Sequence, residues 1–102
     1  MTYSGFQAIA STGVAIALIP ASNSTPSTPC FTLTVQALHA DGTANAANVY
    51  VGGSTVSSTT GYLMQPGDIF TFPPCTVNAY DLKDIYVNGT SGDGLRFVYS
   101  RF

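Results

Sequence analysis

The chain has 102 residues, of which 45% are hydrophobic and 8% are charged, whereas about 25% charged residues are usual in soluble domains. Three basic residues and a net charge of −2 exclude nucleic acid and anionic membranes as partners, because both attract clustered positive charge. The length fits one domain over residues 1–102, and the low charge predicts a surface of hydroxyl, amide and apolar groups suited to packing against other subunits. A secreted β-domain kept soluble by serine and threonine is the alternative.

The N-terminal part of the chain is apolar, with no acidic residue before Asp41 and no basic residue before Lys83. Residues 1–11 show a weak period of two, which predicts either an edge strand or an arm that lies on a neighbour. Residues 14–19, VAIALI, predict a strand with two apolar faces, and each face needs cover. This run is too short to span a bilayer and lacks the cationic start of a secretory signal, so we expect synthesis in the cytoplasm.

A proline-rich loop then precedes the clearest strand of the chain. Residues 20–29 hold three prolines among serines and threonines and predict a surface loop. Residues 30–38, CFTLTVQAL, alternate apolar and polar side chains, so one face should meet the core and the other water. Residues 39–47 predict a turn-rich loop that contains the single histidine, His39. No His, Glu or Cys accompanies it at metal-ligand spacing, which favours a solvent-facing imidazole without a chemical role.

Residues 48–72 show the rhythm of short strands most plainly. The apolar runs VYV, YLM and IFTF are separated by stretches of glycine, serine and threonine. Residues 65–68, QPGD, predict a type II turn, because Pro66 presets φ at its second position and Gly67 supplies the positive φ of its third.

The C-terminal part continues this pattern. Residues 82–87 and 94–99 predict the last strands, and the glycine-rich segment between them predicts a turn. Residues 49–55 resemble residues 85–91, which predicts two equivalent strands whose tyrosines face outward. No segment has a sustained period of 3.6. We therefore predict an all-β chain, a single-domain antiparallel β-sandwich or a jelly-roll-like barrel of seven to eight short strands.

Few residues are candidates for chemistry. Cys30 and Cys75 are the only cysteines, and a disulfide between them would stabilise the fold by roughly 4 kcal/mol in the chain-entropy model. Two free thiols are the usual outcome in a reducing compartment, and both alternatives stay open. There is no glutamate, and Asp68, Asp81, Asp84 and Asp93 lie in predicted turns, where aspartate is common. We predict no catalytic residue, no metal site and no cofactor, and hence no enzyme.

Two segments, VYVGGSTVSSTTGYLMQPGDIFTF and the C-terminal DLKDIYVNGTSGDGLRFVYSRF, resemble small structural proteins of tailed bacteriophages, including capsid decoration or cement proteins with β-sandwich folds. The resemblance covers residues 49–102. It implies a virion protein of the capsid surface without enzymatic activity, often a trimer, whose partners are the major capsid protein and copies of itself. The two cysteines and the neutral, apolar first forty residues are not typical of that family.

We therefore expect a decoration subunit, made in the host cytoplasm, that stabilises the phage shell through apolar, low-charge interfaces. The candidate interface residues are aromatic or aliphatic: Tyr3, Phe6, Ile9, Tyr50, Tyr62 and Tyr86. The alternative is a carbohydrate-binding or host-attachment module of a phage fibre, in which Tyr50, Tyr62 and Tyr86 stack on sugars. The lack of tryptophan, the strongest aromatic platform, counts against this alternative.

Overall fold

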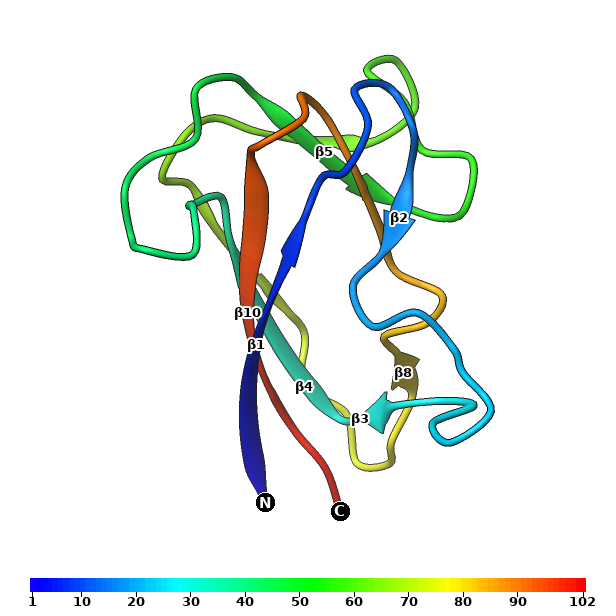
Figure 1. Ribbon diagram of the computed structural model, residues 1–102. Helices are drawn as coiled ribbons and strands as arrows, with labels where there is room; N and C mark the ends of the chain where they lie inside the picture. The colour runs from blue at the N-terminus through cyan, green and yellow to red at the C-terminus, as the bar shows by residue number, and fades with distance from the viewer.

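A computed structural model describes residues 1–102, and in it the chain forms β-strands and no helix (Figure 1). The predicted all-β fold is thereby confirmed. No helix of the kind that could cross a membrane is present. The strands are β1 Thr2–Ala8, β2 Ile16–Ala17, β3 Pro29–Cys30, β4 Thr32–Gln36, β5 Val49–Gly52, β6 Tyr62–Met64, β7 Ile69–Phe72, β8 Tyr80–Asp81, β9 Tyr86–Asn88 and β10 Gly94–Ser100.

The strand count of ten exceeds the predicted seven to eight because β2, β3 and β8 have two residues each, too few to show a period in the sequence. All strand pairs are antiparallel. Sheet A has the order β1-β10-β4-β7, sheet B has the order β2-β9-β5-β6, and β3 pairs with β8 alone. Figure 1 shows β1, β10 and β4 side by side in one layer and β5 and β2 in the other.

The core lies between sheets A and B and follows the alternation of their strands. In β4, Leu33 and Val35 are 0% exposed while the residues beside them are half-exposed. In β5 of sheet B, Val49 and Val51 are buried in the same core from the other side, and Tyr50 faces outward as predicted. Because both sheets contribute to one cluster, the fold is a β-sandwich. The cluster consists of Ile9, Leu18, Cys30, Leu33, Val35, Ala37, Val49, Val51, Met64, Leu82, Val87, Leu95, Phe97 and Tyr99.

The N-terminal segment is the edge strand β1, paired with β10 from Thr2 opposite Ser100 to Ala8 opposite Gly94. Two glycines allow this close pairing. The ring of Phe6 lies where a side chain at Gly94 would project, and a Cβ at Gly5 would lie 2.7 Å from the Phe97 ring. Each aromatic ring therefore covers a glycine of the neighbouring strand. The two termini lie together as a result (Figure 1).

The segments around β2 and β7 differ in how well the sequence predicted them. The turn at residues 65–68 is confirmed, since Asp68 N donates to Gln65 O at 2.9 Å and Gly67 has φ of +87°. This turn carries the chain from sheet B to sheet A. The strand predicted over residues 14–19 is reduced to β2. Val14 N bonds to the Ser11 carbonyl in a turn before it, and although Leu18 N bonds to the Ile85 carbonyl in register with β9, Ile19 N bonds to the Leu82 carbonyl and leaves that register.

Candidate interaction surfaces

The outer face of sheet A extends across four strands. Strand register brings its side chains into rows: Ser4, Val98, Thr34 and Thr71 form one row across four strands. Hydroxyl groups bridge neighbouring strands, with Thr34 and Thr71 3.3 Å apart and Thr2 and Ser100 3.1 Å apart. We define this face by its outward side chains: Thr2, Ser4, Phe6, Thr32, Thr34, Gln36, Ile69, Thr71, Arg96, Val98 and Ser100.

One charge and two exposed aliphatic side chains mark this face. Arg96 is its single charged residue and forms no ion pair. Val98 is 47% exposed and Ile69 is 62% exposed. A groove of about 480 Å³ runs across the face beside these residues, between Phe6 of β1 and Ile69 of β7. Such a surface offers apolar area, neutral hydroxyls and one unpaired donor group to a partner.

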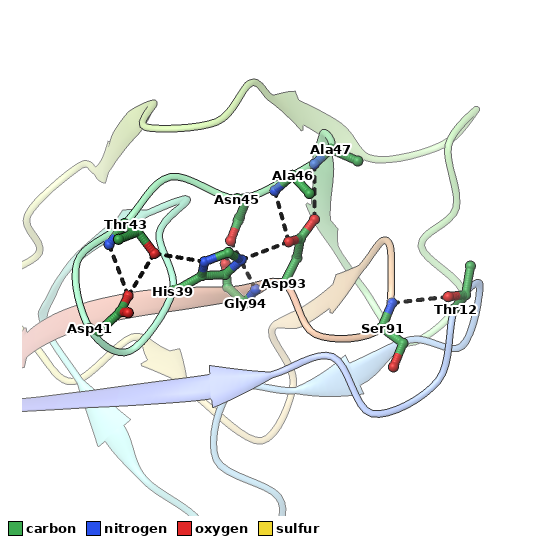
Figure 2. A network of polar contacts seen from close by, with 10 residues as sticks. All are labelled: Thr12, His39, Asp41, Thr43, Asn45, Ala46, Ala47, Ser91, Asp93 and Gly94. Carbon is green, nitrogen blue, oxygen red and sulfur yellow. Dashed lines mark hydrogen bonds and ion pairs between the residues drawn. The ribbon is translucent and has the colours of Figure 1, made fainter.

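A polar network links the loop after β4 to the loop before β10 (Figure 2). His39 Nε2 lies 2.9 Å from Asp93 Oδ1, and His39 Nδ1 lies 2.9 Å from Thr43 Oγ1. The backbone N–H groups of Ala46 and Ala47 donate to the same Asp93 carboxylate at 2.9 and 3.0 Å. Asp93 is buried, with 2% of its surface exposed. The prediction that His39 faces solvent is therefore corrected: its side chain is 31% exposed, and both ring nitrogens lie within hydrogen-bond distance of other side chains.

The hydrogen positions in this network indicate an anchor. The Thr43 hydroxyl donates to Asp41 Oδ1 at 2.7 Å, and a carboxylate such as Asp93 only accepts. The Thr43 hydroxyl proton is therefore directed to Asp41 rather than to the imidazole of His39. A hydroxyl nucleophile would instead donate its proton to the imidazole. The network thus fixes the 39–47 loop onto the 89–94 loop, and the Asn45 side chain adds hydrogen bonds to both N–H and C=O of Gly94.

The carboxyl group of Asp93 is held ionised by this arrangement. Burial opposes its charge, but hydrogen bonds from Ala46 N, the His39 ring and Ala47 N outweigh burial, so the pKa of Asp93 lies below its usual value. The Thr43 side chain and then its backbone N–H likewise lower the pKa of Asp41. Sequence spacing could not reveal the pair, because His39 and Asp93 are 54 positions apart.

The candidate interface residues do not form one surface. Tyr3 and Phe6 lie on β1, where Tyr3 stacks on Tyr99 with ring centroids 5.3 Å apart. Tyr50 and Tyr86 lie on the outer face of sheet B. Ile9 is a correction, since it is 1% exposed and packs in the core, where it cannot meet another molecule.

Tyr62 lies at the edge between the two sheets, opposite Val51 of β5, so its side chain is on the other face of sheet B from Tyr50. It is 55% exposed and its ring packs on Phe70 at 4.7 Å. Phe70, Phe72 and Tyr80 continue this row of edge-to-face rings into the small sheet. Of the three tyrosines in the carbohydrate-binding alternative, Tyr50 and Tyr86 therefore share one face of sheet B and Tyr62 lies on the other.

The two cysteines lie in neighbouring segments and are free thiols in this structure. Cys75 N donates to the carbonyl of Phe31, the residue after Cys30, at 3.0 Å. Burial, followed by the charge of Asp81, raises the pKa of the Cys30 thiol to about 11. Cys75 is half-buried. Of the two alternatives that the sequence left open, this structure has the free thiols.

Comparisons with protein-family models, with curated proteins and with solved structures each give no match for this chain. No three His, Cys, Asp or Glu residues lie together in a group that could hold a metal ion.

Proposed function

We propose that this chain is a non-enzymatic structural subunit that assembles through the outer face of sheet A with copies of itself and with a larger shell. The observation that supports the proposal most strongly is the composition of this face, which combines exposed Val98 and Ile69 with neutral hydroxyls and one charge. The centres of protein interfaces are depleted in charged residues in the same way.

The size of the face fits this role. The molecule measures 35 × 25 × 25 Å, so its broadest side offers roughly 800 Å², the area that one partner contributes to an interface of standard size. A stable contact must therefore use most of the face. Many weak contacts of this kind act together when copies occupy one particle.

The position of Arg96 favours a ring over a two-fold dimer. A two-fold axis near Arg96 would oppose the two guanidinium groups, and like charges brought together out of water are costly. A cyclic trimer, or a contact with a different protein, places another surface opposite Arg96. This agrees with the trimer that the resemblance to capsid decoration proteins implies, and we propose a virion surface as the place of assembly.

Matched charge variants test which face assembles. Val98→Glu places a carboxylate in the middle of the face, whereas Val77→Glu places it on an exposed loop, where Val77 is 62% exposed. Sedimentation velocity should show dissociation for Val98→Glu and wild-type association for Val77→Glu, because taking a carboxylate out of water into the interface is costly even with Arg96 beside it on β10. Equal association of both variants would exclude the sheet A face. A purified shell that binds wild type and Val77→Glu but not Val98→Glu would support the virion role.

A further inference from the structure

A second groove lies on the opposite side of the molecule, over the outer face of sheet B. Its volume is about 420 Å³, which is within the range of small-molecule sites. Its walls are the turn at Thr12 and Gly13, residues 47–50 where the chain enters β5, the loop at residues 57–58, and residues 88–90 where the chain leaves β9. Eight of its ten lining residues are polar or glycine, and none is charged.

Asn88 presents an unpaired oxygen to this groove. The residue is 6% exposed, and its amide nitrogen donates to Val56 O at 2.9 Å and to Gly13 O at 3.3 Å. These two donated bonds fix the orientation of the amide, so the other side-chain atom is the carbonyl oxygen. That oxygen makes no hydrogen bond within the protein. Since no buried polar side-chain atom lacks a partner, it must open to the groove that Asn88 lines. An acceptor that opens into a groove without a partner in the protein is free to accept a hydrogen bond from a ligand or water.

The walls of the groove are held in place before any ligand arrives. Thr12 Oγ1 accepts from Ser91 N at 2.9 Å (Figure 2). Gly13 N donates to Gly89 O at 3.0 Å, which ties the turn to the end of β9. On the other wall, Ser57 Oγ lies 3.1 Å from the hydroxyls of Thr59 and Thr60. A preformed site of this kind loses little freedom on binding.

The free polar groups of the groove are neutral and include both donors and acceptors. Asn48 and Tyr50 line it, and neither side chain makes a hydrogen bond within the protein. Tyr50 also supplies an aromatic ring, which combines apolar area with a polar hydroxyl. Ions are poor candidates because no residue of opposite charge lines the groove. We propose that this groove binds a neutral saccharide, whose hydroxyls pair with Asn48 and Asn88 and whose apolar face lies against Tyr50.

This proposal is independent of assembly through sheet A, because the two surfaces lie on opposite sheets of the sandwich. Either can fail without the other. It differs from stacking on Tyr50, Tyr62 and Tyr86, since it uses Tyr50 without Tyr62 and adds the amides of Asn48 and Asn88.

Titration of the ¹⁵N-labelled protein with neutral oligosaccharides tests the groove. The probes are cellotriose, maltotriose, mannotriose and tri-N-acetylchitotriose, each at up to about 10 mM, which detects even millimolar binding. At least one probe should shift the amide resonances of residues 12–13, 47–50, 57–58 and 88–90 together. No shift with any probe, or shifts confined to the region of Tyr62, would overturn the proposal.

Variants then distinguish specific binding in this groove from nonspecific binding. Asn48→Ala and Tyr50→Ala should each weaken binding roughly tenfold. Tyr50→Phe, which keeps the ring, covers the case in which Tyr50→Ala does not fold, and should weaken binding less. Tyr86→Phe on the same sheet but outside the groove is the control and should bind as wild type. Equal affinity of Asn48→Ala and wild type would overturn the assignment.

Discussion

The two outer faces of the sandwich differ although the strands beneath them follow the same alternation. On sheet A, Val98 and Ile69 stay 47% and 62% exposed, and hydroxyls bridge neighbouring strands. On sheet B, the segment from Gly53 to Gly61 folds over the strands, and Val56 is 5% exposed against Gly52 and Gly61. The comparison teaches that loops decide the chemistry of each face: an uncovered sheet suits another protein, and a partly covered one leaves a polar groove.

We expect the largest effect from breaking the Asp93 network, which anchors the 39–47 loop to the 89–94 loop. Asp93→Ala removes the acceptor of Ala46 N, Ala47 N and His39, so we expect it to lower the free energy of unfolding by about 3 kcal/mol. Urea denaturation measures the change. The matched control is Asp84→Ala, whose carboxylate is exposed beside Lys83 and should matter by less than about 0.5 kcal/mol. Equal losses of unfolding free energy for both variants would show that the network does not stabilise the fold.

A smaller effect should distinguish the tight packing of sheet A from the open loop over sheet B. Gly94→Ala drives a methyl group into the Phe6 ring and to 2.8 Å from Gln7 O, so we expect a loss of about 2 kcal/mol by overpacking. Gly53→Ala meets nothing within 4 Å and should be neutral or slightly stabilising. Thermal unfolding of the two variants compares them. If Gly94→Ala and Gly53→Ala unfold at the same temperature, β1 does not pack on β10 as described.

The pH dependence of stability should report the same anchor more weakly. The pKa of Asp93 is lower in the folded chain than its usual value of 3.8, so its contribution is present above about pH 4 and is lost as the pH falls through the folded pKa. Wild type should therefore lose more stability than Asp93→Asn between about pH 5 and pH 2. Parallel pH profiles of the two proteins would contradict the lowered pKa of Asp93.

The last prediction concerns the reactivity of Cys30 in β3 rather than the stability of the fold. Because the pKa of Cys30 is raised to about 11, its reactive thiolate is scarce near neutral pH. In the reduced Cys75→Ser variant, the remaining thiol of Cys30 should react with iodoacetamide roughly a hundredfold more slowly than a free cysteine. Reaction at the rate of free cysteine would show that the fold around Cys30 opens readily.

Local alternation predicted much of this fold and little of its surfaces. The strands β4 and β10 follow from the alternation of residues 30–38 and 94–99, and the turn after β6 follows from Pro66 and Gly67. The pairing that places Thr34 opposite Val98 joins residues far apart in the chain, and no local pattern encodes it.

Neither the groove on sheet B nor the Asp93 network could be predicted from the sequence, because both depend on contacts between residues far apart in the chain. Asn88 reaches the groove through the fold-back of the segment around Val56, which contacts it across 32 positions. Ile9 was expected on a surface because its neighbours alternate weakly, yet the chain leaves β1 one residue before it and turns it into the core. For the surfaces, the sequence predicted only that the outward residues of the strands are mostly neutral.

Sedimentation equilibrium of the unmodified chain, from about 1 µM to about 500 µM, addresses assembly through sheet A most directly. We predict a mass that rises with concentration towards three times the 10.6 kDa of the single chain. A mass of 10.6 kDa at every concentration would contradict self-association through the uncovered sheet.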